Sequence, residues 1–375
     1  MKVAIVHDWL VAYGGAERVL EQMLLLYPEA DLYCLLDVLP ERERAFLKGK
    51  PVQTSFIQKL PKLRKWYRRY LPLMPMAVEQ FDLSAYDLII SSSHTAAKGV
   101  LTEPDQLHLS YVHTPVRYAW DQQHQYLKEV KMTRGIKSWT AKAFMHYLRL
   151  WDLRTVNGVD GFIANSKFIA RRIRKAYHRD ADVIYPPVAV DAFLMGKEKE
   201  DYYLTVSQMV PYKKIDLIVT AFREMPERRL VVIGDGPEAA AVRAAANDAP
   251  NITFLGYQPS AALIDYMQKA RAFVFAAEED FGITPLEAQA CGTPVIAYGK
   301  GGVQETVQGL TNLFPTGVFF EEQTVSSLKK GVELFEAEEI RISPQMCRDN
   351  AMRFSPERFR KKLHDYILRM EQNYT

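Results

Sequence analysis

Short apolar runs alternate along the chain with longer segments in which apolar residues recur every three or four positions. The short runs are typical of strands buried on both faces, and the longer segments are typical of the helices that cover them. The first half of the chain predicts strands at Val3–Val6, Leu32–Leu36, Leu88–Ser91, Leu109–Val112 and Gly161–Ala164. It predicts helices at Ala16–Tyr27, Lys137–Val156 and Phe168–Tyr177. This alternation indicates an α/β fold built on parallel sheets.

A second series of the same kind follows an interruption in the middle of the chain. Tyr185-Pro186-Pro187 breaks the pattern, and the polar, charged stretch from Gly196 to Asp201 suits a hinge between domains. The strands predicted beyond it are Tyr202–Val206, Leu230–Ile233, Ile252–Leu255, Ala272–Phe275 and Pro294–Ala297. We therefore expect two facing Rossmann-like domains, at 1–190 and 198–355, with a cleft between the carboxyl ends of their strands. A helix within 356–375, from about Pro356 to Glu371, is expected to pack back on the first domain.

Composition narrows the class of protein. A chain of 375 residues with 48% hydrophobic and 25% charged residues is long enough for two globular cores. The first apolar run is broken at His7 and Asp8, which predicts a strand and not a signal peptide. No stretch reaches the roughly 18 apolar residues of a membrane-spanning helix. Three cysteines far apart, without a CxxC motif, predict a reduced cytoplasmic protein without disulfides or structural zinc: Cys34, Cys291 and Cys347.

Positive charge is concentrated in one segment. The formal net charge is +3, yet Arg44–Val78 contains nine Lys and Arg residues and no Asp or Glu. Such a local excess favours a surface function over a nucleic-acid partner. In 59–76 the basic side chains alternate with aromatic ones and precede an apolar edge, which predicts docking on an anionic membrane at the inner face of the cell. A solvated face beside a soluble acceptor site, or contacts with an anionic polysaccharide, would produce the same pattern.

The block from Phe275 to Val295 contains the densest candidate chemistry. A strand ends, an acidic loop with Gly282 follows, and a helix is predicted from near Pro285. Thr284, Pro285 and Glu287 match a capping box, so Glu287 could be no more than a helix cap. The alternative is that free amides around Gly282–Thr284 bind a pyrophosphate at the helix N-terminus.

Glu279 and Glu287 are separated by seven residues, with Phe281-Gly282 between them and Ala288, Ala290, Gly292, Pro294 and Val295 after them. In this register the block resembles the signature of family 4 retaining glycosyltransferases of the GT-B fold. The resemblance implies that Glu279 lies at the donor sugar and Glu287 at the ribose of the nucleotide. It assigns these further residues to the donor site: Phe281, Gly282, Ile283 and Thr284.

The segment Val206–Phe222 resembles a second part of the same family. Lys213 and Lys214 are predicted in the first turn of a helix, where a cation opposes the helix dipole and a bound anion would remove that cost. The family implies that Lys213 binds the donor diphosphate. Gln208 stands where the family usually has Arg and cannot supply a positive charge, and Lys214, where many relatives have Gly, compensates.

Other matches extend over the whole chain. The Gly14-Gly15 pair is similar to the family's glycine loop, and His113 stands where relatives direct a histidine at the transferred sugar. Gly234, Gly256 and Tyr257 correspond to loops near the nucleotide in the family's second domain. Polar and aromatic residues after His113 suggest a wall of the acceptor site, because aromatic faces suit sugar rings: Arg117, Tyr118, Trp120 and Asp121.

The resemblance implies transfer of a sugar from a nucleoside diphosphate to a saccharide or lipid-linked saccharide acceptor, with retention of configuration. The only Asp-x-Asp, Asp180 and Asp182, precedes a strand away from the expected cleft, so no metal and no cofactor beyond the nucleotide sugar are expected. Lys213, the helix N-terminus and backbone amides would then stabilise the leaving group. The short motifs look most like mannosyltransferases that use GDP-mannose in polysaccharide or glycolipid assembly.

Several alternatives share parts of this pattern. UDP- and dTDP-sugars remain possible donors. A sugar-nucleotide isomerase of the same architecture would bind the nucleotide without an acceptor, and a non-catalytic nucleotide-sugar sensor would bind it without turnover. A nicotinamide-dependent oxidoreductase would require a G-x-G-x-x-G fingerprint, which the sequence lacks.

Overall fold

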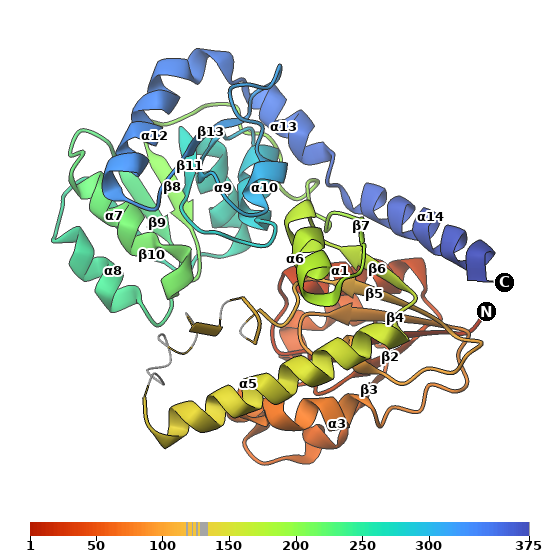
Figure 1. The fold of residues 1–375 in the computed structure, drawn as a ribbon. Coiled ribbons are helices and arrows are strands. Elements are labelled where there is room, and N and C mark those ends of the chain that lie inside the picture. Colours follow the sequence, from red (N-terminus) through yellow and green to blue (C-terminus); the bar gives the residue numbers. More distant parts are fainter. Residues whose placement is uncertain (118, 122, 125–126, 128–133, 375) are drawn as a thin grey trace. The chain divides into compact units, whose positions relative to one another are not determined.

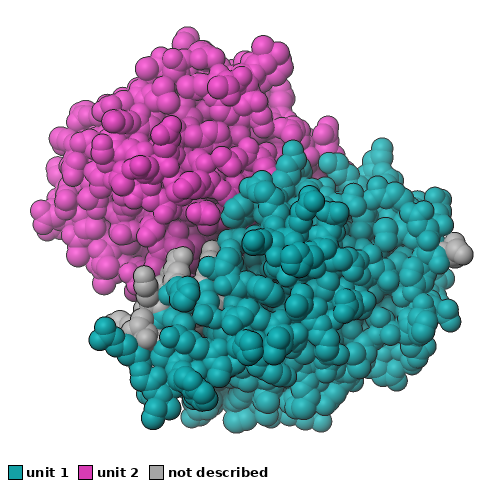
Figure 2. Space-filling model, viewed as in Figure 1, with its two compact units in different colours: residues 1–187, 359–375 teal, residues 188–358 magenta. Residues whose placement is uncertain are grey.

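The computed structural model describes residues 1–117, 119–121, 123–124, 127 and 134–374 (Figure 1). The chain divides into two compact units (Figure 2). Unit 1 contains residues 1–187 and 359–375, and unit 2 contains residues 188–358. Each unit has a parallel sheet of its own, so the expected α/β class is confirmed.

The sheet of unit 1 has seven strands in the order β3-β2-β1-β4-β5-β6-β7. Their bounds are β1 Val3–His7, β2 Asp31–Cys34, β3 Val52–Thr54, β4 Leu88–Ser93, β5 Leu107–Val112, β6 Gly161–Ala164 and β7 Asp182–Val183. Ile5 of β1 lies beside Leu32 on one side and Ile90 on the other. Because the strand order runs outward from β1 in one direction and from β4 in the other, the switch point of this sheet lies between β1 and β4.

Both faces of this sheet are covered, as the unbroken apolar runs predict. Val3 and Ile5 belong to one core cluster, and Ala4 and Val6 belong to the cluster on the opposite face. The helices of unit 1 are α1 Gly15–Leu26, α2 Leu63–Trp66, α3 Met74–Val78, α5 Ile136–Thr155, α6 Lys167–Tyr177 and most of α14 Pro356–Tyr374. Short 3-10 helices are η1 Glu41–Glu43, η2 Ala45–Leu47, η3 Phe56–Lys59, η4 Tyr67–Leu73, η5 Ala97–Gly99 and η6 Val156–Gly158.

Helix α14 follows unit 2 along the chain but belongs to the core of unit 1. Phe359, Leu363 and Ile367 are buried in the same cluster as Ile5 and Leu109. The Tyr374 hydroxyl donates to the Pro104 carbonyl at 2.6 Å. The core of unit 1 is therefore built from two stretches of chain that are separated by all of unit 2.

The sheet of unit 2 has six strands in the order β10-β9-β8-β11-β12-β13. Their bounds are β8 Tyr203–Val206, β9 Leu230–Ile233, β10 Ile252–Gly256, β11 Ala272–Phe275, β12 Val295–Tyr298 and β13 Gly317–Phe320. The helices are η7 Pro211–Lys213, α7 Ile215–Arg223, α8 Ala239–Ala246, α9 Ser260–Lys269, α10 Ile283–Ala290, α11 Val303–Thr306, α12 Val325–Glu338, η8 Glu339–Arg341 and α13 Pro344–Met352. The switch point of this sheet lies between the neighbouring strands β8 and β11.

Each predicted strand lies within two residues of an observed one at either end. The short strands β3, β7 and β13, which lie at or near the sheet edges, were not predicted. The basic segment 59–76 forms only short helical pieces, since α2 ends at Trp66 and the chain continues as η4 with Pro72 inside it. Among the described residues no helix is long and apolar enough to cross a bilayer. The thiols of the three cysteines are free and buried.

Candidate functional site

Lys213 and Glu279 form an ion pair at the carboxyl edge of the unit 2 sheet. Lys213 ends η7 after β8, and Glu279 follows β11, so the pair spans the switch point where ligands of open α/β sheets bind. Their side chains are 18% and 19% exposed, so both charged groups are largely withdrawn from water. The structure therefore brings together two residues that lie 66 positions apart and that the sequence had assigned to a donor site.

A left-handed residue determines where Lys213 lies. Lys214 has φ 56° and is the N-cap of α7, so the chain turns sharply between η7 and that helix. The prediction that Lys213 and Lys214 lie in the first helical turn is therefore wrong, since both precede α7. The left-handed conformation also explains why glycine suits this position, because only glycine adopts it without steric cost.

The backbone of Glu279 is held by the glycine loop that follows β12. The Gly302 amide donates to the Glu279 carbonyl at 2.8 Å. Gly301 has φ +84°, and a Cβ at that position would lie 2.5 Å from the same carbonyl oxygen. Only glycine permits this approach, so the Gly301-Gly302 pair fixes the position of the carboxylate-bearing loop.

Helix α10 begins at Ile283, with Gly282 as its N-cap at φ +89° and without a side-chain cap. The predicted start near Pro285 is thus two residues late, and the capping box of Thr284 and Glu287 is not formed. Glu287 lies in the second turn and is only 6% exposed. The first-turn amides at this end have no side-chain cap, which suits an anion.

The neighbouring loops complete this edge of unit 2. Gly234 has φ +128°, and a Cβ there would lie 1.9 Å from the Ser207 carbonyl oxygen, so its glycine is explained by packing against the loop after β8. Gln208 in that loop is exposed. Gly256 ends β10, and Tyr257 directly after it is 81% exposed. The roles of these residues in nucleotide binding remain predictions.

In unit 1, His113 lies directly after β5 at the carboxyl edge of the sheet. Its Nε2 is 2.8 Å from the Ser92 hydroxyl oxygen, and that oxygen is 3.0 Å from Nδ1 of His7. Burial, together with the nearby His94 and His7, holds the pKa of His113 well below its usual range. His113 is therefore a neutral imidazole at physiological pH, positioned by a residue of β4.

A second buried pair lies beside His113 and was missed by the sequence analysis. The Asp8 carboxylate accepts the backbone N–H groups of Thr95, Ala96 and Ala97 at 2.5–2.8 Å and also contacts Nδ1 of His94. Burial raises the pKa of Asp8, but the interactions with His94 and the amides outweigh burial and lower it. Burial lowers the pKa of His94, and Asp8 more than offsets this and raises it. The signal in the sequence was the polar run Ser91–His94 at the end of an apolar strand.

The described residues of the predicted acceptor wall contact different parts of unit 1. The Trp120 indole N–H donates to the Asp152 carboxylate at 2.8 Å, and Asp121 pairs with Arg172 at 3.0 Å, so both contact helices of unit 1. Arg117 is half-buried near His94, and Tyr118 lies outside the described residues.

At the glycine loop, Gly14 is the N-cap of α1 and its amide donates to the Glu17 carboxylate at 2.9 Å. An internal carboxylate thus occupies part of the anion-binding end of this helix. Asp180 and Asp182, the residues of the Asp-x-Asp, contact Arg174 and Arg369. Within the described ranges no group of three or more His, Cys, Asp or Glu could hold a metal ion.

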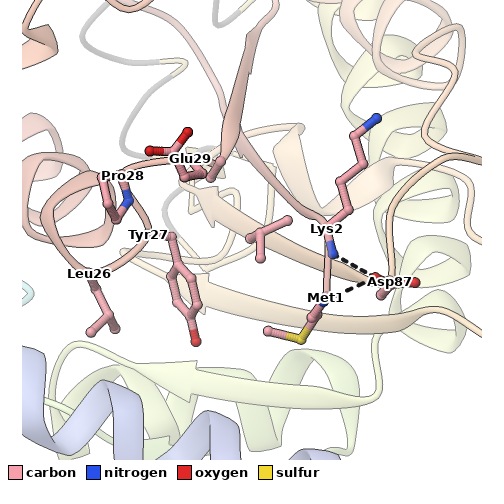
Figure 3. Close-up of a pocket in the computed structure, with 9 residues that line it drawn as sticks. Met1, Lys2, Leu26, Tyr27, Pro28, Glu29 and Asp87 are labelled. Atoms are coloured by element: carbon pink, nitrogen blue, oxygen red, sulfur yellow. Dashed lines mark hydrogen bonds and ion pairs between the residues drawn. The ribbon is translucent and has the colours of Figure 1, made fainter.

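A hollow of about 540 Å³ lies at the opposite edge of the unit 1 sheet (Figure 3). It is lined by the amino ends of β1 and β4, where the Lys2 amide donates to Asp87 at 2.5 Å, and by Tyr27 and Glu29. None of the predicted site residues lines it. Ligands of open α/β sheets bind at the carboxyl ends of strands, so this hollow is not the candidate site.

Models of known protein families match both units of the chain. Residues 13–192 match the model of Glycosyltransferase Family 4, and residues 192–354 match the model of Glycosyl transferases group 1. Together the two models cover residues 13–354, and both describe glycosyltransferases. The resemblance inferred from the Glu279 to Glu287 block is therefore confirmed at the level of the family.

Curated relatives match this chain over parts of their length. A D-inositol 3-phosphate glycosyltransferase of Mycobacterium avium is 30% identical over 190 residues, which are 44% of this chain and 45% of the relative. A GDP-mannose-dependent monoacylated alpha-(1-6)-phosphatidylinositol monomannoside mannosyltransferase of Corynebacterium glutamicum is 35% identical over 124 residues, 30% of this chain and 32% of the relative. The chain thus spans less than half the length of these relatives.

Solved structures are similar over the whole of this chain. HepE of Anabaena, in complex with UDP and glucose, has a TM-score of 0.69 at 16% identity and covers 98% of this chain and 99% of its own. Sucrose-phosphate synthase of Thermosynechococcus elongatus has a TM-score of 0.71 at 15% identity and covers 100% of both chains. At this identity the likeness concerns the fold alone, and the expected GT-B fold is confirmed.

Proposed function

We propose that the protein is a retaining glycosyltransferase that moves a hexose from a nucleoside diphosphate to a saccharide or lipid-linked saccharide acceptor. The observation that carries the proposal is the Lys213–Glu279 pair at the switch point of unit 2, beside the N-terminus of α10 that has no side-chain cap. A cation, a carboxylate and first-turn amides are the groups that a sugar diphosphate requires.

Binding of the donor follows from these groups. The diphosphate would lie at Gly282–Thr284 and compete with Glu279 for the Lys213 ammonium group, which leaves the Glu279 carboxylate to accept hydrogen bonds from sugar hydroxyls. Glu287, one helical turn further along α10, would accept the ribose hydroxyls. Lys213 and the amides stabilise the charge of the leaving group, so we propose that transfer requires no metal and no other cofactor.

The chemical step would take place on one face of the sugar. The bond between the anomeric carbon and the phosphate oxygen breaks, and the acceptor oxygen bonds to the anomeric carbon from the same side. The proton of the acceptor hydroxyl passes to the departing phosphate, so that the products are a glycoside and a nucleoside diphosphate. His113 is neutral and held by Ser92, which suits a hydrogen bond to the transferred sugar.

GDP-mannose is the proposed donor. The mannosyltransferase of Corynebacterium glutamicum named above supports this choice, since its 124-residue match has the higher identity of the two relatives. The UDP complex of HepE supports a UDP-sugar as the alternative, because that protein has the same fold. A sugar-nucleotide isomerase remains the second candidate function, since it would use the same donor groups.

A donor panel with and without acceptor tests the proposal. The purified protein is incubated with GDP-mannose, UDP-sugars and dTDP-sugars, in the presence and absence of lipid-linked saccharides. Release of nucleoside diphosphate that requires an acceptor supports transfer, and the anomeric configuration of the product tests retention. A new sugar nucleotide formed without acceptor would show isomerisation instead.

A further inference from the structure

Helix α5 of unit 1 presents apolar side chains to solvent. It lies on the surface of unit 1 alongside α3 (Figure 1). Its inner face packs Met145, Leu148 and Trp151 into the core. On the outer face, large apolar side chains recur at helical spacing with these exposed fractions: Ile136 83%, Trp139 71%, Tyr147 50% and Leu150 58%. We call these four residues the α5 stripe. An exposed apolar stripe of this kind is typical of a surface that binds another molecule.

The exposed charges that α5 itself carries are positive. Lys137, Lys142 and Arg154 are exposed on the same helix. Asp152 is the only acidic residue between Ile136 and Thr155, and it is buried in an ion pair with Lys98. Arg154 is ion-paired with Glu79, so the positive charge that favours an anionic partner comes from Lys137 and Lys142.

The basic segment 59–76 lies on the same side of the unit 1 sheet as α5. Leu63 and Met74 of this segment belong to the same core cluster as Met145 of α5. A hydrogen bond of 2.8 Å from the Trp151 indole to Glu79, directly after α3, joins the two regions.

The basic segment buries most of its apolar side chains at least partly in the protein, whereas a helix embedded in a membrane would expose them. Most of its aromatic and apolar residues are packed at least in part against the core, although Met76 is 50% exposed. Lys59, Lys62, Arg64 and Lys65 are exposed. The Lys62 ammonium lies 4.7 Å from the ring centre of Trp66. The segment therefore supplies mainly positive charge, and most of the exposed apolar surface comes from α5.

We propose that the α5 stripe docks unit 1 on an anionic lipid bilayer, with the apolar side chains at headgroup level and the basic segment facing the lipid phosphates. Tryptophan and tyrosine beside lysine are the side chains that favour a bilayer interface. A second copy of this chain is disfavoured as the occupant, because self-association would bring the lysine charges of two α5 helices together. The idea that docking brings unit 1 to a lipid-linked acceptor rests on the proposed function. Lipid binding itself does not rest on it.

Vesicle co-sedimentation of the full chain tests the docking. Vesicles of phosphatidylcholine with phosphatidylglycerol should bind the protein in a salt-sensitive manner, and vesicles of phosphatidylcholine alone should bind it at least about tenfold more weakly. Trp139→Ser with Leu150→Ser should weaken binding by about tenfold or more. Lys137→Ser with Lys142→Ser should weaken it by a similar factor.

Leu313 and Phe314 provide the matched control, since they are an exposed apolar pair in unit 2 at 83% and 61%. Leu313→Ser with Phe314→Ser should leave vesicle binding unchanged. Lipids brominated on their acyl chains provide a local readout, because they should quench the wild-type fluorescence and Trp139→Phe should remove most of that quenching. Thermal unfolding of each variant confirms that the fold is retained.

Equal binding by the α5 variants and the wild type would overturn the proposal, as would equal binding to both kinds of vesicle. Self-association that Trp139→Ser abolishes, without vesicle binding, would assign the stripe to a second copy instead. Acceptor-dependent release of nucleoside diphosphate is measured separately with a short soluble saccharide. Failure of that reaction would count against the proposed function, and failure of vesicle binding would count against the docking surface alone.

Discussion

Lys213 and Glu279 are ion-paired across the switch point of the unit 2 sheet, with less than a fifth of each side chain exposed. Two opposite charges withdrawn from water satisfy each other, and removal of one leaves the other without its partner in a poorly solvated position. Donor binding must therefore replace this pair with new contacts, and substitutions at the two positions should have different consequences.

Substitution of the two glutamates should separate turnover from donor binding. Glu279→Gln should lower turnover by about 100-fold with a smaller effect on nucleoside diphosphate affinity, because the charge beside the reacting sugar is lost. Glu287→Gln should weaken nucleotide binding by about tenfold or more, because a charged acceptor of hydrogen bonds is lost. Steady-state kinetics and calorimetric titration with nucleoside diphosphate measure both effects. The exposed neighbour Glu278 is the control, and Glu278→Gln should behave as wild type. Unchanged nucleotide affinity in Glu287→Gln would remove the ribose assignment.

We expect Lys213 to stabilise the charge of the leaving group, a role that a metal ion has in other enzymes. Lys213→Ala should reduce turnover by about 100-fold, since a preorganised charge at the diphosphate is removed, and the wild type should keep its activity in EDTA. Lys214→Gly examines the neighbouring position separately. It should raise the free energy of unfolding by about 1 kcal/mol, because the position is left-handed. Activity that EDTA abolishes and manganese restores would contradict metal-independent transfer.

His113→Ala should impair turnover while the protein stays folded and binds nucleotide. The reason is that the structure positions this neutral ring through Ser92 at the carboxyl edge of the unit 1 sheet, whereas the residues proposed to bind the nucleotide belong to unit 2. Ser92→Ala should give a weaker effect in the same direction, since the ring keeps its place in the chain but loses its hydrogen bond. The measurement is turnover alongside nucleotide affinity. A variant with full turnover would exclude a role for His113 at the sugar.

The buried His108 should make unfolding depend on pH. Burial lowers its pKa from the ordinary 6.5 to about 4. The unfolded chain therefore binds a proton between these pH values while the folded protein does not, so stability should fall as the pH is lowered from 6.5 to 4. His94, with its raised pKa, acts in the opposite direction. The comparison is therefore made with His108→Gln, whose urea unfolding should depend less steeply on pH in this range. Parallel pH dependence of the two proteins would contradict the assignment.

Helix α14 should be as important for unit 1 as a central core element. Leu363→Ala should lower the free energy of unfolding by about 2–5 kcal/mol, because the side chain is fully buried in the core cluster. Leu368 on the same helix is 43% exposed, and Leu368→Ala should change stability by less than about 1 kcal/mol. Urea titration followed by circular dichroism measures both. Equal effects of the two substitutions would show that α14 is not held by its buried face.

The fold was predictable because central parallel strands are buried on both faces and read as unbroken apolar runs. Gly161–Ala164 and Leu230–Ile233 were predicted with their observed bounds for this reason. The edge strand β7 carries no such signal, since it has only two residues, Asp182–Val183. The Glu279 and Glu287 block was recognisable because its spacing follows one loop and one helix, which are local features.

The contacts that depend on tertiary structure could not be predicted. Asp8 and His94 lie 86 positions apart, and only the pairing of β1 with β4 brings them together. The turn at Lys214 was hidden as well, because its residue type gives no sign of a left-handed backbone. Where a glycine stands at such a position, the conformation can be inferred from the sequence, and where a lysine stands there it cannot.

The position of α14 in the core of unit 1 also affects the order in which the two cores can form during synthesis. During synthesis the ribosome releases residues 1–187 first, but their core lacks Phe359, Leu363 and Ile367 until all of unit 2 has been translated. Unit 2 is thus the first to have nearly its whole core available, although it is encoded second. The apolar groove that α14 will occupy stays open on the nascent first unit meanwhile, and it is the surface that a chaperone would be expected to cover.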